Sequence, residues 1–449
     1  MKRYALTALL CIALISPAYA SYNPSLAAME KEQAKLEAMG GKFASCSQEQ
    51  QYMFGDWKCL REEIANEGVL FSSTFTCDVL GDVSGGKQRA VRYDHSMGWD
   101  INFDLEKFAQ IQDTQFHISG LWRQGRNLSK EVIGNDLVAS SIFGSEQFRF
   151  YAIYLEKLFF DQKLSIKAGR IATGDDFAFS PLYWTYVSNA VDGCPINIPI
   201  NMFFPVYPTA VWGARAKIVL NKDFYMMSGI YNGDKTVGYD KYAGLNFSLR
   251  LSRGVAFAQE IAYVPNTSPD SKGLPGHYKA GFYYNGAVVR DLYSDGNGSS
   301  YAATGLPQKK RVGNYNVYLH ADQMLYRAKG TVDNGLTALA VTAIGPDNVN
   351  KFPFLIMGGL IYKGLIPGRD NDLTAFEAVY SQYSKSLRRS EKSIGNSGQT
   401  YELMIEFTQK IMVTKWMFIQ PDLQYIIRPG GTGDTENALV VGSRFGLSF

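Results

Sequence analysis

Charged residues are scarce in this sequence of 449 residues, where they make up 19% of the chain and leave a net charge of +3. Soluble domains typically contain about 25% charged residues, and nucleic-acid-binding proteins usually show a basic run or a strong positive field. Neither feature occurs here, which disfavours a nucleic-acid partner. The four histidines are scattered outside any recognisable nucleophile motif, so the sequence predicts neither catalysis nor a cofactor.

Long hydrophobic runs are also missing after the first residues. No later stretch approaches the 18 apolar residues of a spanning helix. At the start, Lys2 and Arg3 precede an apolar segment from Tyr4 to Ile15, and Ala18-Tyr19-Ala20 forms a small-x-small cleavage site. This pattern predicts a secretory signal peptide over residues 1–20 and an exported protein.

Only four cysteines remain once Cys11 leaves with the signal peptide: Cys46, Cys59, Cys77 and Cys194. In an oxidising compartment, four cysteines allow two disulfides in three pairings. Cys46–Cys59 is the candidate with the short loop. A zinc site is disfavoured, because no two cysteines stand two to four residues apart and no histidine is near.

Residues 21–68 read as a helical segment in the periplasm. Pro24 to Met39 is rich in helix-forming residues and precedes a Gly-Gly pair. A second short helix is predicted over Trp57 to Glu67, with Asp56 as N-cap and Gly68 just past its end.

From Val69 onward the sequence alternates between apolar and polar residues. Leu403, Ile405 and Phe407 fall on one face of a strand, opposite Glu402 and Glu406. Segments of about ten such residues, separated by turns, are typical of outer-membrane strands. The sequence therefore predicts an all-β fold, a transmembrane antiparallel barrel over residues 69–449. A secreted β-sandwich also alternates, but it does not explain so many strands of similar length or a final strand that ends on Phe449.

The pattern contains seventeen candidate strands, whereas a barrel with both ends in the periplasm needs an even number. Ala243 to Leu251 is one of them, and the short turn Ser252-Arg253-Gly254 after it is expected in the periplasm. The rhythm of short and long connections slips between residues 255 and 335, so the extra strand is expected there and sixteen strands are predicted. Sixteen leave a lumen wide enough for water and small solutes. An interfacial girdle of tyrosines is predicted at Tyr263, Tyr283, Tyr380 and Tyr425.

A long connection over residues 170–209, opened by Arg170, is rich in aromatic residues and proline. A loop of this composition is expected to fold into the lumen and narrow it. Sugars are held by polar groups that reach their hydroxyls and by rings that lie against their C–H faces. These properties predict a constriction with donors, acceptors and an aromatic face: Arg123 and Arg126; Glu156, Asp175 and Asp176; Tyr183 and Trp184.

The sequence resembles the carbohydrate-selective porins of the OprB family. The resemblance runs from about residue 52 to 449 and rests on several stretches: Phe54-Gly55-Asp56-Trp57, Asp78-Val79-Leu80-Gly81, His117-Ile118-Ser119-Gly120-Leu121, Tyr154-Leu155-Glu156, Ala168-Gly169-Arg170, Tyr231-Asn232-Gly233-Asp234, Ala321-Asp322-Gln323-Met324-Leu325-Tyr326 and Pro421 to Gly431. It implies a sixteen-stranded outer-membrane barrel that passes monosaccharides passively. It further implies in-folded loops and a constriction of arginines and acidic residues.

The expected function is diffusion of small sugars such as glucose across an outer membrane, with sugars and membrane lipid as partners. A homo-oligomer stays open. The alternatives are a non-selective porin and a structural envelope protein cross-linked through cysteines. A membrane-embedded hydrolase is a weaker one, because no lipid-facing nucleophile with histidine can be assembled.

Overall fold

The computed structural model describes residues 51–449 except 145, 192 and 269–270. The predicted signal peptide, the helix expected at Pro24 to Met39, and Cys46 lie outside the described residues. No helix among the described residues combines the length and the hydropathy needed to cross a membrane.

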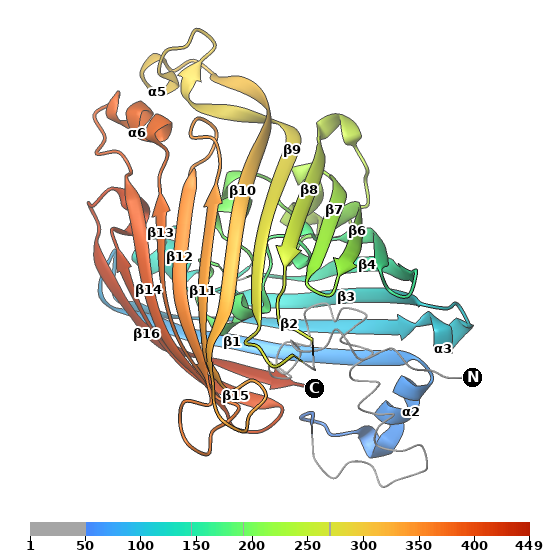
Figure 1. Cartoon of the computed structure of the whole chain (residues 1–449). Helices are drawn as coiled ribbons and strands as arrows, with labels where there is room; N and C mark the ends of the chain where they lie inside the picture. Colours follow the sequence, from blue (N-terminus) through green and yellow to red (C-terminus); the bar gives the residue numbers. More distant parts are fainter. Residues whose placement is uncertain (1–50, 145, 192, 269–270) are drawn as a thin grey trace.

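Sixteen antiparallel strands form a closed barrel in which each strand pairs with its neighbours in sequence (Figure 1). The barrel closes where β1 pairs with β16, with Phe75 opposite Leu447. The strands are β1 (Val69–Gly86), β2 (Ala90–Asp104), β3 (Thr114–Gly125), β4 (Gln147–Phe159), β5 (Leu164–Ile171), β6 (Val211–Asn221), β7 (Phe224–Asn232), β8 (Val255–Tyr263), β9 (Gly276–Asp295), β10 (Gln308–Arg327), β11 (Gly335–Ile344), β12 (Phe354–Lys363), β13 (Leu373–Gln382), β14 (Tyr401–Met412), β15 (Met417–Ile427) and β16 (Glu436–Ser448).

Helices are short and lie in the segment before β1 and in the connections between strands, including those inside the barrel. The α-helices are α2 (Leu60–Asn66), α3 (Leu105–Ala109), α4 (Asn197–Asn201), α5 (Tyr301–Thr304) and α6 (Lys385–Lys392). Single turns of 3-10 helix are η2 (Trp57–Cys59), η4 (Thr173–Asp175), η5 (Pro181–Thr185), η6 (Lys235–Gly238), η7 (Asp240–Tyr242), η8 (Leu251–Arg253) and η9 (Pro429–Gly431), and η3 (Ser129–Ile133) is a π turn. The predicted helix near Trp57 is present, although Asp56 does not cap it through its side chain.

The N-terminal segment is fastened to the end of the last strand. Arg61 of α2 donates to the main-chain oxygen of Phe449 at 2.9 Å. The ring of Phe54 stacks on the ring of Phe449, with 5.2 Å between their centroids. This contact places α2 at the rim where both ends of the barrel lie. Because β1 leaves this rim, the connections that follow odd-numbered strands all lie at the opposite rim.

The predicted alternation describes most strands. In β14, Phe407 is exposed while Glu402 and Glu406 are fully buried, and in β16 Val441 and Phe445 face outward while Arg444 is buried. Because successive side chains of a strand point to opposite faces, every second side chain lies on the lumen side. The outward faces therefore form the apolar surface that lipid requires.

One predicted strand is wrong, and it lies outside the interval in which the extra strand was expected. Residues 243–251 form part of the connection between β7 and β8, at the rim opposite the chain ends, so the turn Ser252-Arg253-Gly254 is not on the periplasmic side. Two of the segment's carbonyls accept from side chains and not from a neighbouring strand: Arg170 donates to Asn246 O at 2.7 Å and Trp212 donates to Phe247 O at 2.8 Å.

The misleading signal has a physical cause. The segment presents a row of exposed apolar side chains, Leu245, Phe247, Leu249 and Leu251. The segment thus exposes every second, apolar residue as a strand would, although it is not a strand of the barrel. The tyrosine girdle needs a similar correction, because Tyr283 is fully buried and donates to Phe203 O at 2.8 Å. Its neighbour Tyr284 is the exposed residue.

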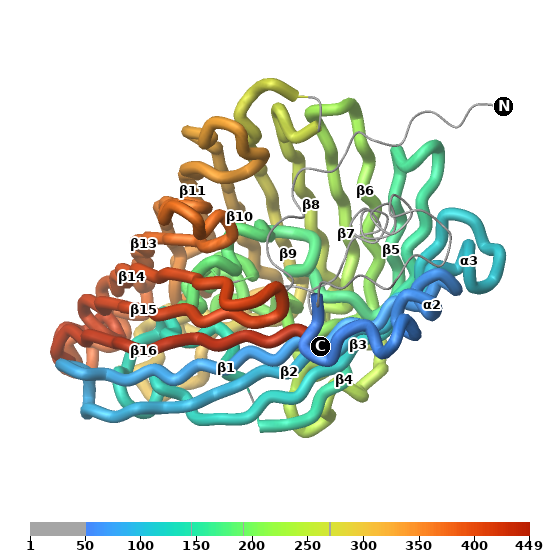
Figure 2. The backbone as a smooth tube through the Cα atoms, turned by 90° about the horizontal axis from the view of Figure 1, so that it is seen from below, coloured from blue at the N-terminus to red at the C-terminus, as the bar shows by residue number. Residues whose placement is uncertain are grey.

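Two connections fill the inside of the barrel. Seen from below, the ring of strands surrounds loop segments drawn in green (Figure 2). The first connection, residues 126–146, joins β3 to β4, and the second, residues 172–210, joins β5 to β6. We call them the first and second inner loops.

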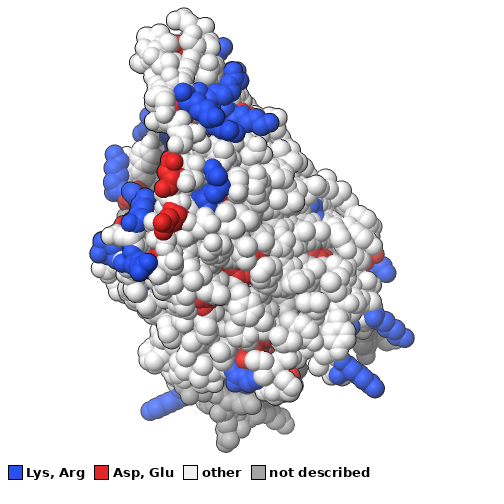
Figure 3. Space-filling view, turned by 90° about the vertical axis from the view of Figure 1, so that its left-hand side faces the viewer, with Lys and Arg blue, Asp and Glu red and all other residues white. Residues whose placement is uncertain are grey.

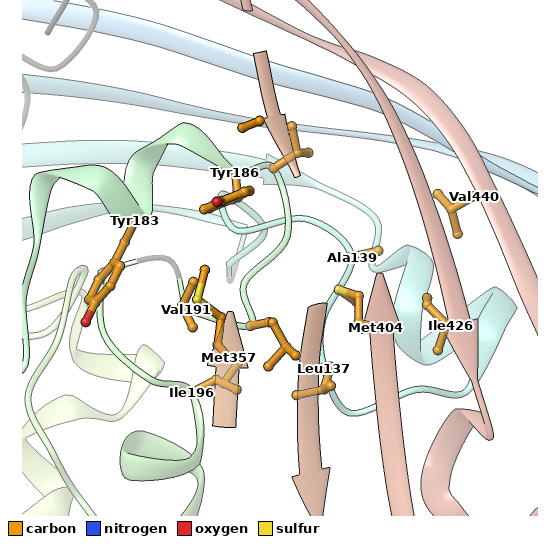
Figure 4. Close-up of a cluster of buried hydrophobic side chains, with 14 of the residues drawn as sticks. Leu137, Ala139, Tyr183, Tyr186, Val191, Ile196, Met357, Met404, Ile426 and Val440 are labelled. Atoms are coloured by element: carbon orange, nitrogen blue, oxygen red, sulfur yellow. The ribbon is translucent and has the colours of Figure 1, made fainter. Parts of the chain in front are cut away.

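Apolar residues of these loops pack on apolar residues of the lumen wall (Figure 4). Leu137 and Ala139 of the first inner loop and Tyr186 of the second are completely buried, in one apolar cluster with wall residues such as Met404 of β14. A fully buried side chain of this kind contributes roughly 1.5–3 kcal/mol. The lumen side of β11 to β16 therefore carries apolar side chains, where an apolar-out and polar-in alternation would predict polar ones, because the inner loops pack on this surface.

Candidate functional site: the constriction between the inner loops and the wall

Buried acidic residues of β14 hold the inner loops by their backbone. Glu406 accepts from the N–H groups of Val187 and Ser188 at 2.6 and 3.0 Å. Glu402 accepts from the N–H groups of Asp136 and Leu137 at 3.0 and 2.6 Å. Each carboxylate thus fixes two consecutive residues of one loop, and hydrogen bonds to a charged group contribute about 1.5–3 kcal/mol each.

Arg444 of β16 connects the two loops to each other. Its guanidinium makes a two-pronged ion pair with Asp78 of β1 at 2.7 and 2.8 Å. It also donates to Ser141 Oγ at 2.7 Å and to Val187 O at 3.1 Å. A bidentate arginine fixes geometry as well as charge, so both loops take their position from the seam where the barrel closes.

A cavity of about 430 Å³ remains between the loops and the wall. Its lining includes Arg123 of β3, Arg149 of β4, Lys410 of β14 and Arg444 of β16, together with the rings of Trp184 and Tyr207 from the second inner loop. Asp240 is the carboxylate in the described lining. Small-molecule sites commonly measure about 300–1000 Å³, so this cavity is suited to a small solute.

Two arginines of the cavity differ in how fully their donors are used. Arg149 pairs with Asp240 at 3.0 Å and donates to Gly238 O at 2.9 Å. Arg123 lies over the ring of Tyr207 at 4.6 Å, and its hydrogen bonds to Ser96 Oγ and Phe143 O are long, at 3.4 Å each. The described residues include no ion-pair partner for Arg123. Arg123 is therefore the cation best placed to donate to a solute.

Of the residues predicted for the constriction, Arg123 and Trp184 line the cavity. Arg126 lies apart from it, with a side chain 63% exposed and paired with Glu131 at 2.6 Å. Hydrogen bonds from Arg92 and Arg126 hold the pKa of Glu131 below its usual value.

The predicted acidic residues belong to a buried network elsewhere in the lumen. Glu156 pairs with Arg215 at 2.9 Å, and Asp176 binds both Lys167 and Arg215 at 2.9 and 3.2 Å. Burial raises the pKa of Asp176, but the two cations outweigh burial and bring it below its usual value. Asp176 thus holds the base of the second inner loop against the wall, and Glu156 fixes Arg215 within the wall.

Three further predicted residues also make internal contacts. Asp175 accepts from the Tyr151 hydroxyl at 2.6 Å, and the Tyr183 hydroxyl meets Nδ1 of His320 at 2.8 Å. Arg170 donates to Ala210 O at 2.9 Å, where the second inner loop returns to the wall. None of the three is part of the cavity lining.

The disulfide expectation is resolved in part. Cys59 is disulfide-bonded, and its predicted partner Cys46 lies outside the described residues. Cys77 of β1 and Cys194 of the second inner loop are thiols rather than partners in a bridge, so a second disulfide between them is not formed. Their elements explain this, because Cys77 is fixed in the wall and Cys194 is buried inside the lumen.

Arg149, Lys410 and Arg444 were not predicted as site residues. A signal for them existed, because each occupies an inward position of its strand, and Lys410 follows Glu402, Glu406 and Thr408 on the same face. The period of a strand gives the side on which a residue lies. It does not give the height at which the inner loops cross the lumen.

The model of the carbohydrate-selective porins, OprB family, matches residues 88–449. Among curated proteins, the chain is 25% identical over 419 residues to Porin B of Pseudomonas aeruginosa, covering 89% of this chain and 91% of that one. It is 23% identical over 430 residues to the putative porin QuiX of Acinetobacter baylyi, covering 90% of this chain and 94% of that one.

Among solved structures, the chain is similar to the high-pH structure of Pseudomonas putida OprB, with a TM-score of 0.83, 26% identity, and coverage of 90% of this chain and all of that one. The family model spans most of the chain and includes every strand from β2 to β16. The chain therefore belongs to the OprB family of carbohydrate-selective porins and is a sugar-selective channel of the Gram-negative outer membrane.

Proposed function

We propose that the preferred solutes are single small sugars such as glucose, and that they are selected in the cavity between the inner loops and the wall. The observation that carries this proposal is the position of Arg123, a cation with weakly used donors in a cavity of about 430 Å³. A guanidinium presents several N–H donors in a fixed plane, which suits the adjacent hydroxyls of a sugar ring.

The roles predicted for the constriction are kept in part. Arg123 donates to sugar hydroxyls and Trp184 offers a ring to the C–H face, since both line the cavity. Arg126 is bound to Glu131 outside the lining, so we give its donor role to Arg149. The acceptor role proposed for Glu156, Asp175 and Asp176 passes to groups of the lining, Asp240 and Gln420.

Swelling of liposomes that contain the purified protein tests the proposal. Glucose should enter faster than mannitol, an open-chain polyol of similar size, and much faster than sucrose. Arg123→Gln should lower the glucose rate relative to mannitol by about tenfold to a hundredfold, since a hydrogen bond from a charged donor contributes about 1.5–3 kcal/mol. Trp184→Leu should act in the same direction.

Arg126→Gln is the matched control, because it removes a guanidinium that lies outside the cavity. It should leave the ratio of glucose to mannitol unchanged. If the wild-type protein passed both solutes equally fast, the cavity would be a general pore. If Arg126→Gln lowered the ratio as much as Arg123→Gln, selection would take place elsewhere along the lumen.

A further inference from the structure

Strands β9 and β10 rise above the rest of the barrel wall. Each has 20 residues, whereas β8 has 9 and β11 has 10. Their upper halves form a hairpin with α5 at its tip, and α6 packs beside it (Figure 1). The hairpin follows an odd-numbered strand, so it lies at the outer rim, opposite the chain ends.

The outward face of this hairpin shows an ordered series of opposed pairs. From the middle of the wall toward the outer rim, the pairs are Phe282 with Val317, Tyr284 with Tyr315, Val288 with Val312, and Arg290 with Lys310. All eight side chains are exposed. The three pairs nearer the middle of the wall are apolar or aromatic and include two tyrosines, and the cations follow beyond them, which matches the order from hydrocarbon to headgroup in a bilayer.

The last of these pairs sets two positive charges directly opposite each other. Like charges at such positions destabilise a strand pair, and among the described residues neither Arg290 nor Lys310 has an ion-pair partner. The nearby carboxylates are engaged, because Asp291 pairs with Arg311 at 2.6 Å and Asp295 accepts from Thr304 at 2.9 Å. The two positive charges of Arg290 and Lys310 are thus available to bind an anion from outside the protein.

Helix α6 adds further cations beside the hairpin. The guanidinium of Arg389 lies over the ring of Tyr293 of β9, at 4.8 Å, and Lys392 and Lys309 are exposed. On that side of the molecule, Lys and Arg side chains gather near the top, below the protruding tip (Figure 3). We call the exposed and opposed pair Arg290 and Lys310 the outer basic patch.

We propose that the outer basic patch binds phosphate groups of the glycolipid in the outer leaflet of the outer membrane. The pair Arg290–Lys310 faces lipid rather than the lumen, at the level where headgroups lie, and this position favours a lipid phosphate over a solute. Arginine and lysine are the residues that recognise phosphate, by bidentate contact and as a point charge. Such binding would offset the repulsion across the hairpin and fix the height of the barrel in the membrane.

Native mass spectrometry in detergent tests the proposal with bis-phosphorylated lipid A as the probe. The double variant Arg290→Gln/Lys310→Gln should bind about thirtyfold more weakly than the wild type. The control double variant Lys163→Gln/Lys222→Gln, which removes the same charge from turns at the periplasmic rim, should bind like the wild type. Glucose-induced liposome swelling should be unchanged in both variants, which shows that they are folded.

Two further probes separate lipid from free anion. Lipid A without phosphate should bind the wild type as weakly as bis-phosphorylated lipid A binds the patch variant. Inorganic pyrophosphate should not displace bis-phosphorylated lipid A at equal concentration. Equal binding of lipid A to the patch variant and the control variant, or equal binding of lipid A with and without phosphate, would overturn the proposal. Displacement by pyrophosphate would mean a site for free anions, which also contradicts it.

Discussion

At the scale of single residues, Arg444 joins the seam of the barrel to both inner loops. It neutralises Asp78, which is 1% exposed, and donates to both inner loops. Its inward position follows from the alternation in the final strand, where Val441 and Phe445 face lipid. Its partners do not follow from the sequence, because Asp78 is 366 residues away and meets it only when the barrel closes.

We predict that Arg444→Gln lowers the stability of the barrel by about 3–5 kcal/mol, since removal of one partner leaves a buried charge without compensation. Heat-induced loss of β-structure, followed by circular dichroism, measures the effect. The double variant Arg444→Gln/Asp78→Asn should recover part of the loss because it removes the unpaired charge. Arg126→Gln, on the exposed rim, serves as the control. A loss as large in the control as in Arg444→Gln would contradict this assignment.

Residue-scale predictions from the sequence fail where two neighbours compete for one face. Tyr283 and Tyr284 are adjacent and chemically equal, and only the register of β9 decides that Tyr284 faces lipid while Tyr283 binds Phe203 O. In contrast, Tyr263 and Tyr425 were predicted as outward and are exposed. Alternation predicts the outward residues reliably where a series of apolar residues shows which positions face lipid. It predicts them poorly where a bulge or two adjacent aromatic residues would allow either set of positions to face lipid.

At the scale of elements, the inner loops depend on the wall more than on their own structure. Their helical turns have five residues or fewer, and such short turns are not stable alone. Glu402 and Glu406 replace the missing backbone partners, while buried rings such as Tyr186 supply packing.

We predict that Glu406→Ala loosens the second inner loop and widens the pore. The N–H groups of Val187 and Ser188 would lose their acceptor, and each unpaired buried group costs about 1–3 kcal/mol. Single-channel conductance should rise and become noisier, and sucrose should enter liposomes faster. Glu436→Ala, at an exposed end of β16, should change neither quantity. Unchanged sucrose entry in Glu406→Ala would show that packing alone holds the loop.

The failed strand at residues 243–251 belongs to this scale as well. Sequence patterns report which face meets lipid, and this segment does present an apolar face there. They do not report whether backbone groups pair with a neighbouring strand or with side chains such as Arg170 and Trp212. The barrel itself was predictable because its surface must be apolar in every strand. The number of strands was less secure because one non-strand segment meets the same requirement.

At the scale of the whole molecule, the barrel, the inner loops and the seam between β1 and β16 together concentrate positive charge at the narrow part of the pore. Four cations, Arg123, Arg149, Lys410 and Arg444, line the cavity, against the single carboxylate of Asp240 in its described lining. Asp240 pairs with Arg149 and Asp78 pairs with Arg444, whereas Arg123 has no ion-pair partner among the described residues and adds positive charge to the cavity. The chain's net charge of +3 gives no indication of this local excess.

This arrangement predicts a channel that conducts anions in preference to cations, because rings of like charge in a narrow pore attract ions of the opposite sign. In a planar bilayer under a KCl gradient, the reversal potential should have the sign of chloride permeation. Arg123→Gln should shift it toward zero, whereas Arg290→Gln/Lys310→Gln, which removes two cations from the outer surface, should leave it nearly unchanged. A cation-selective wild type would mean that Glu156, Asp175 and Asp176 dominate the field along the lumen despite their internal partners. Since neutral sugars carry no charge to be steered, anion preference and glucose selectivity can vary independently, and Arg123 is the residue whose loss should reduce both.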